Sequence, residues 1–306
     1  MTTDVRAPRL GIAGHDLGGT PREALAALGG ELGLHALELW PSNLGDLSLD
    51  AYAELLAEHD VTVYAVNADT GRGRFGPPAE REAALAAARE GVQRAVALGA
   101  RYVQLYLGPP AAGTLAQRVA AVAEALAPAA AQAHEHGIAL LVENDFDHRW
   151  EDPQRRNLAR SPQALCALVE AVGADRLRLT VDHCNFVLGG VDPAAAFATM
   201  REHVVNVHLK DCVPVDRALV ADVPSHDRSV LRDGDGDGLA ARAAVVGAGT
   251  TGWERLIAGL AADGFDGWLT LDPHCEPRDT IGWSRASLDW LRPRIGTWTT
   301  TRAMTR

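Results

Sequence analysis

The chain has 306 residues, of which 47% are hydrophobic and 23% are charged, a balance typical of a globular protein with a large core. The formal net charge of −11 disfavours a nucleic-acid interface, which needs a basic stripe, and also an anionic membrane surface. No run approaches the roughly 18 apolar residues of a membrane span, and the first ten residues, MTTDVRAPRL, contain no apolar h-region. The four cysteines form no CxxC pair, so we expect a reducing, cytoplasmic location with no nucleic-acid or membrane partner.

Short apolar runs alternate with longer stretches of helical period. The predicted strands are residues 10–13, 36–39, 61–66, 101–107, 138–142, 177–181, 204–207 and 267–271. The predicted helices are residues 21–32, 49–59, 79–98, 115–136, 162–172, 193–202, 252–262 and 281–292. Eight strand–helix units with near-continuous apolar strands predict a (β/α)8 TIM barrel, formed by residues 1–306 as a single domain with loose tails at 1–8 and 296–306. An open doubly wound sheet is disfavoured, because no GxGxxG follows the first strand.

One connection, residues 212–250, is too long for an ordinary turn, and it shows no convincing element. We expect it to form a loop over the barrel mouth. Its stretch 233–238 imitates the start of a calcium-binding loop but has Ala244 at the position that requires a bidentate Glu. Gly247 and Gly249 either hold an anion or form a turn, and Thr251 with Glu254 predicts a capping box for the next helix.

Four consecutive predicted strands end in polar residues that suit a metal ion. They are Glu143, Asp182, His208 and Asp272. The carboxyl ends of barrel strands meet at one face, where active sites lie. Three carboxylates there would repel one another and raise each other's pKa, and a divalent cation relieves this repulsion. Oxygen ligands with one imidazole suit Mn²⁺, which we favour, or Mg²⁺, Co²⁺ or Zn²⁺.

Five segments together resemble the xylose isomerase-like TIM barrels of the sugar phosphate isomerase/epimerase superfamily. They are LLVEND, TVDHCNFVLGG, VVNVHLKD, VGAGTTGW and GWLTLDPH, and Glu38 in GLHALELW matches a recurrent acidic position. The resemblance implies one divalent metal held by Glu143, Asp182, His208 and Asp272. Asp272 departs from the pattern, which has Glu there. Either the strand moves inward, or Glu276 replaces it, or water is the fourth ligand.

The reaction implied by this site is proton transfer on a sugar. A metal with open positions can chelate a hydroxy-ketone and stabilise an enediolate. The resemblance makes Glu143 and Asp272 the catalytic proton-transfer pair of an isomerase or epimerase. A lyase on the same scaffold is the alternative, of the keto-inositol dehydratase or C-glycoside-cleaving type. Endonuclease IV-like DNA repair is disfavoured by the charge and the sparse histidines, and a non-catalytic partner subunit is the remaining alternative.

The substrate is expected to be a small sugar or polyol, and the resemblance makes a homo-oligomer possible. The candidate substrate-binding residues are His183, Asn185, Lys210, Trp40, Asn67 and His15. Lys210 either binds a substrate oxygen or forms an ion pair with Asp211. Arg72 and Arg74 are expected to be solvated. The cysteines that follow the proposed ligand strands are expected to be small buried thiols rather than zinc ligands.

Overall fold

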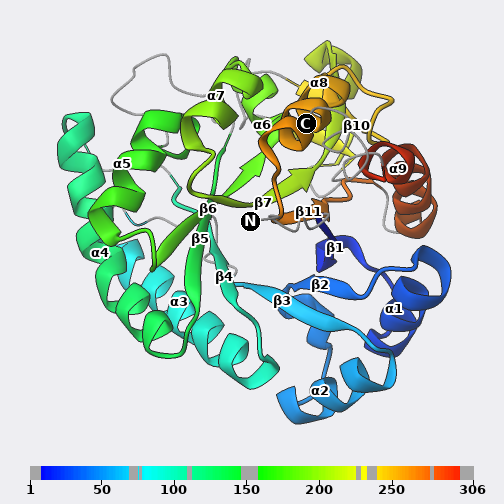
Figure 1. Ribbon diagram of the computed structural model, residues 1–306, viewed down its shortest axis with the longest axis horizontal. Coiled ribbons are helices and arrows are strands. Elements are labelled where there is room, and N and C mark those ends of the chain that lie inside the picture. Colours follow the sequence, from blue (N-terminus) through cyan, green and yellow to red (C-terminus); the bar gives the residue numbers. More distant parts are fainter. Residues whose placement is uncertain are drawn as a thin grey trace, which may run out of the picture.

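Eight parallel strands form a closed barrel in the computed structural model, which describes residues 8–68, 75, 78–108, 112–145, 158–224, 229–232, 240–275 and 279–296 (Figure 1). The strands are β1 (Arg9–Ala13), β2 (Ala36–Leu39), β3 (Thr62–Asn67), β4 (Tyr102–Leu105), β5 (Ala139–Glu143), β6 (Leu177–Asp182), β7 (Val204–Leu209) and β11 (Trp268–Leu271). The ring order is β1-β11-β7-β6-β5-β4-β3-β2. The predicted barrel is confirmed, and each predicted strand ends within two residues of an observed one.

The helices surround the barrel, as Figure 1 shows. They are α1 (Pro21–Ala27), α2 (Leu49–Glu58), α3 (Pro78–Leu98), α4 (Leu115–Glu135), α5 (Pro162–Val172), α7 (Pro193–Met200), α8 (Trp253–Asp263) and α9 (Thr280–Ile295). All eight were predicted, although α1 continues as a π-helical turn over Leu28–Leu32. Strand side chains such as Val103 and Val142 and helix side chains such as Leu126 and Leu168 form one buried apolar core. Among the described residues no helix is long and apolar enough to cross a membrane.

The expectation that residues 212–250 lack regular elements was wrong. Part of this segment forms a separate antiparallel sheet of β8 (Asp211–Val215), β10 (Ala240–Ala244) and β9 (Val230–Arg232). These strands are short, β10 consists mostly of alanine, and β8 contains Pro214, which is tolerated because β8 is an edge strand, so their strand signal is weak. The sheet packs on a short unpredicted helix, α6 (His183–Leu188), through an apolar cluster: Cys184, Leu188, Cys212, Leu231 and Ala241.

Some expectations fall outside the described residues. These are the two tails beyond residues 8 and 296, Arg72 and Arg74, the acidic stretch 233–238, and Glu276.

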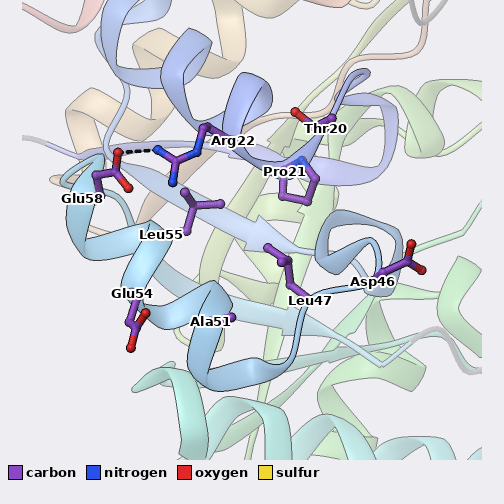
Figure 2. Close-up of a pocket in the computed structure, with 9 residues that line it drawn as sticks. All are labelled: Thr20, Pro21, Arg22, Asp46, Leu47, Ala51, Glu54, Leu55 and Glu58. Atoms are coloured by element: carbon purple, nitrogen blue, oxygen red, sulfur yellow. Dashed lines mark hydrogen bonds and ion pairs between the residues drawn. The ribbon is translucent and has the colours of Figure 1, made fainter.

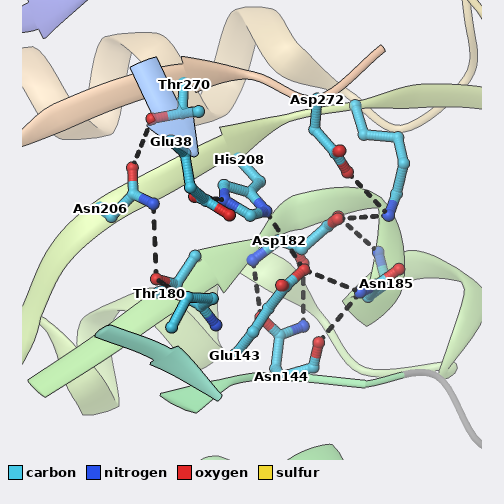
Figure 3. Close-up of polar contacts among 12 residues, drawn as sticks. Glu38, Glu143, Asn144, Thr180, Asp182, Asn185, Asn206, His208, Thr270 and Asp272 are labelled. Carbon is cyan, nitrogen blue, oxygen red and sulfur yellow. Dashed lines mark hydrogen bonds and ion pairs between the residues drawn. The ribbon is translucent and has the colours of Figure 1, made fainter. Parts of the chain in front are cut away.

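A polar layer fills the barrel interior, although the strands were expected to be almost wholly apolar. Thr180 Oγ1 donates to Gln104 Oε1 at 2.6 Å, and Asn206 Nδ2 donates to Thr180 Oγ1 at 3.4 Å. Thr270 Oγ1 donates to Asn206 Oδ1 at 2.7 Å and lies 2.5 Å from Tyr64 Oη. Figure 3 shows Thr270, Asn206 and Thr180 joined in a row beside the acidic cluster. Because every member is hydrogen-bonded, the layer is a rigid floor for the residues above it.

Candidate metal centre

The strand register brings Glu143, Asp182 and His208 together at the carboxyl-terminal face of the barrel (Figure 3). Asp182 lies directly opposite His208 in the β6–β7 ladder, and Glu143 ends the neighbouring strand β5. One ligand atom from each of the three lies within 4.8 Å of the others. All three residues are at most 4% exposed, so water compensates their charge very little.

The ligand atoms in this cluster suit a divalent cation. Glu143 Oε2 and His208 Nδ1 are buried and make no regular hydrogen bond within the described residues, and the buried Asp182 Oδ2 beside them is paired with Lys210 Nζ. Buried polar atoms in proteins are normally satisfied, so two such atoms beside a buried carboxylate require an explanation. Two carboxylate oxygens and one imidazole nitrogen form a donor set that suits Mn²⁺, Co²⁺ or Zn²⁺.

Glu38 orients the imidazole of His208. His208 Nε2 lies 2.9 Å from Glu38 Oε2, and Glu38 is fully buried. A carboxylate only accepts hydrogen bonds, so Nε2 carries the proton and Nδ1 is left to face Glu143 Oε1 at 3.3 Å. Burial alone would lower the pKa of His208, but the charges of Glu143 and Glu38 outweigh it and raise this pKa well above its ordinary value. A carboxylate behind a ligating imidazole is the usual outer partner of a protein metal ligand.

Lys210, the only lysine in the chain, links two of the predicted ligands. Its Nζ lies 2.5 Å from Asp182 Oδ2 and 3.3 Å from Asp272 Oδ2. Burial lowers the pKa of this ammonium, but the two carboxylates outweigh burial and hold the pKa well above its ordinary value. The alternative ion pair between Lys210 and Asp211 was wrong, because Asp211 is engaged elsewhere.

Asp211 holds the loop that precedes α8. Its carboxylate accepts hydrogen bonds from the backbone N–H groups of Gly247 and Gly249 at 2.9 and 3.0 Å, and from Thr251 Oγ1 at 2.6 Å. The anion that the glycine loop binds is therefore a side chain of the same protein. The capping box predicted from Thr251 was wrong, since this hydroxyl is bonded to Asp211 and α8 starts after Gly252 without a side-chain cap.

Asp272 lies apart from the three-residue cluster. Its Oδ1 lies 3.4 Å from His15 Nε2, and its Oδ2 lies 3.2 Å from His274 Nε2 and 3.3 Å from Lys210 Nζ. Burial raises its pKa, but His274, Lys210 and His15 together hold this pKa well below its ordinary value. The structure thus unites three of the four predicted metal ligands and places the fourth beyond the lysine.

The pKa of Asp182 shows how burial and neighbouring carboxylates disfavour a negative charge in the cluster. Burial raises its pKa to about 6, Lys210 opposes this shift, and the charges of Glu143 and Asp272 add to it. Its Oδ1 accepts from the Asn185 N–H at 2.9 Å and so caps α6, while Asn144 Oδ1 accepts from the Asp182 N–H at 2.6 Å. The side chain is therefore fixed on one side and leaves Oδ2 directed at the cluster.

The two predicted substrate-binding residues on α6 differ in position. Asn185 Nδ2 donates to Asn144 O at 2.9 Å and lies 3.4 Å from Glu143 Oε1, so the amide borders the cluster. His183 faces away from it: its Nε2 lies 2.5 Å from Thr251 O and its ring lies 4.7 Å from that of Trp253. The role of His183 in binding substrate stays a prediction without support from its position.

The other predicted substrate residues line the opposite half of the rim. The His15 ring lies 5.1 Å from Trp40, and Trp40 lies 6.2 Å from Tyr106. Asn67 is buried and donates from Nδ2 to Tyr106 Oη at 3.2 Å. Sequence reasoning missed Tyr106 and His274. Tyr106 is the first residue after β4, at the same edge of the barrel where the ligands end their strands, and this position was the available signal.

Two surface grooves lie away from this centre. One, of about 460 Å³, lies between α1 and α2 and contains an exposed ion pair of Arg22 with Glu58 (Figure 2). The other, of about 550 Å³, lies among the amino ends of α4, α5 and α7, where Ser161 and Asp192 already cap the last two helices.

The family profile described as xylose isomerase-like TIM barrel matches residues 25–294. Among solved structures, the IOLI protein with a binding zinc atom has a TM-score of 0.72 at 16% identity, covering 95% of this chain and 99% of that chain. An L-ribulose 3-epimerase has a TM-score of 0.71 at 16% identity, covering 97% and 98%. The probable 3-DHS dehydratase AsbF from Bacillus anthracis has a TM-score of 0.66 at 14% identity, covering 92% and 98%. No curated protein matches the chain significantly. At these identities the solved structures establish a shared fold, and the profile match over most of the sequence shows that the chain belongs to the xylose isomerase-like TIM barrel family.

Proposed function

We propose that the protein is a divalent-metal-dependent isomerase or epimerase of a small sugar or polyol. The observation that carries this proposal is the convergence of buried ligand atoms from Glu143, Asp182 and His208, of which Glu143 Oε2 and His208 Nδ1 make no regular hydrogen bond within the described residues. Neighbours in fold that are described as an L-ribulose 3-epimerase and a D-allulose 3-epimerase support the choice of substrate class.

Glu143, Asp182 and His208 would hold the ion, for which we favour Mn²⁺, with Asp272 as the proposed fourth ligand. When bound, the ion acts as a Lewis acid toward the oxygens of a hydroxy-carbonyl substrate. Glu143 and Asp272 are the proposed acid–base pair that removes a proton next to the carbonyl and returns one. Both are at most 4% exposed, so bulk water competes little for these protons.

The substrate would lie between the two halves of the rim. The wall of His15, Trp40 and Tyr106 offers aromatic surface for the apolar face of a sugar. Asn67 and Asn185 offer amide groups for hydroxyls, and Asn185 Oδ1 is buried without a hydrogen bond within the described residues. Lys210 is placed to contact a substrate oxygen next to Asp182.

Metal removal and isotope exchange test the proposal together. The protein is exhaustively chelated, reloaded with Mn²⁺ and incubated in D₂O with a panel of ketopentoses and ketohexoses that includes L-ribulose and D-allulose. We expect activity only after reloading, with deuterium in a product of unchanged formula. Glu143→Gln should lower kcat at least ~100-fold because it removes a proton carrier, whereas the exposed control Glu170→Gln on α5 should not. An undiminished rate after chelation would reject the mechanism.

A lyase is the second candidate, because the probable dehydratase AsbF shares the fold. Removal of the same proton followed by loss of a β-hydroxyl gives dehydration. In the same assay this outcome is a product lighter by one water.

A further inference from the structure

A second cluster of metal-ligand residues lies beside the candidate centre. His15 follows β1, and Asp272 and His274 follow β11, the strand that pairs with β1. One ligand atom from each of the three lies within 4.8 Å of the others. Their side chains are 3%, 6% and 17% exposed, so the cluster is enclosed but reachable.

The two imidazoles lie close enough to Asp272 to share a metal ion with it. His15 Nε2 lies 3.4 Å from Asp272 Oδ1, and His274 Nε2 lies 3.2 Å from Asp272 Oδ2. These separations are at or beyond the long end of N–H···O hydrogen bonds, which centre on about 2.9–3.0 Å. Ligands about 2.0–2.1 Å from a tetrahedral zinc ion are about 3.3–3.4 Å apart. Each imidazole–carboxylate separation is close to this value, and the two imidazoles contact different oxygens of the same carboxylate.

We propose that His15, Asp272 and His274 form a second divalent-cation site that takes Zn²⁺ or an ion of similar preference. Two imidazoles and one carboxylate form a borderline-soft donor set, unlike the more oxygen-rich set on β5–β7. With three protein ligands the fourth position is open to an oxygen donor, water or a substrate oxygen.

Neighbouring groups are consistent with this assignment. Asp16 Oδ2 lies 3.4 Å from His15 Nε2 and adds negative charge beside the site. His15 Nε2 also contacts Pro273 O at 3.1 Å, and ligation would replace this hydrogen bond. The site shares Asp272 with the proposed isomerase mechanism, but zinc binding to His15 and His274 on β1 and β11 is measured without any isomerase activity.

Zinc stoichiometry tests the proposal. Purified protein is equilibrated with Zn²⁺, desalted and analysed for metal per chain, with binding followed by titration calorimetry. We expect two equivalents for the unaltered protein, one for His274→Ala, one for His208→Ala, and none for the double variant. The matched control His136→Ala, at an exposed histidine, should keep two.

Circular dichroism checks that each variant is folded, and His274→Gln replaces His274→Ala if that variant unfolds. Cobalt substitution of His208→Ala should give the visible absorption of a tetrahedral ion, and this absorption should be lost in the double variant. A His274 variant that retains every equivalent of the unaltered protein would overturn the second site. If zinc is lost in His208→Ala but not in His274→Ala, the proposal of a metal site on β5–β7 is supported and the proposal of a second site is refuted.

Discussion

Replacing Lys210 by methionine removes a buried positive charge from the acidic rim. Its ammonium lies 2.5 Å from Asp182 and 3.3 Å from Asp272, and all three side chains are at most 6% exposed. At an effective dielectric constant of about 20 these two attractions amount to about 7 and 5 kcal/mol. Desolvation of the charged groups offsets several kcal/mol each, so we expect the free energy of unfolding in chelator to fall by about 3–5 kcal/mol.

The same substitution should strengthen metal binding. The ammonium contacts the Asp182 oxygen that we assign to the ion, so its loss removes a competing positive charge. We expect Mn²⁺ affinity, measured by titration calorimetry, to rise about 10-fold or more, which is about 1.4 kcal/mol. Urea unfolding with and without Mn²⁺ should show that the ion recovers most of the lost stability, while the exposed control Arg89→Met changes neither quantity. Equal or weaker Mn²⁺ binding in the variant would refute the reasoning.

Four further changes probe the site and the fold around it. Glu38→Gln should weaken Mn²⁺ binding about 10–100-fold in calorimetry, because it removes the carboxylate behind His208; a change below threefold would contradict this orienting role. Gly249→Ala should destabilise the protein by more than about 2 kcal/mol in urea unfolding, since its Cβ would lie 2.1 Å from a carboxylate oxygen. Gly282→Ala, in α9 with no atom within 4 Å, should stabilise it by up to about 1 kcal/mol. Burial lowers the pKa of His183 to about 4, so its neutral form contributes stability that is lost as pH falls from about 6.5 toward 4. The free energy of unfolding in chelator should therefore fall by roughly 3 kcal/mol less over this range in His183→Gln, and parallel pH profiles would refute the assignment.

The ligand cluster could be predicted from the sequence because parallel strands end at one edge. Glu143, Asp182 and His208 each terminate a recognisable apolar run, so their convergence needs only the barrel topology. The alternative ion pair of Lys210 with Asp211 was wrong, and the alternation of side chains along a strand could have excluded it. Adjacent residues of a strand point to opposite faces, so Lys210 shares the inner face with His208 while Asp211 turns outward.

The polar layer under the centre obeys the same rule. Thr180, Asn206 and Thr270 precede Asp182, His208 and Asp272 by two positions, so they face the interior one level lower. What the sequence could not supply was the position of Asp272. The distance from a strand-end carboxylate to a shared point depends on side-chain length and on competing partners, here two imidazoles and an ammonium.

The distribution of charged groups around the rim indicates where a cation would bind. Glu38 lies at one end of the row of carboxylates and receives a hydrogen bond from His208, and Asp272 at the other end is flanked by Lys210 and two imidazoles. In the middle, Glu143 Oε2 is buried without a regular hydrogen bond within the described residues, and Asp182 Oδ2 is paired with Lys210 Nζ. Negative charge is thus concentrated at the point toward which His208 directs its Nδ1. A dication there satisfies all three atoms at once, which a proton on any one of them would not do.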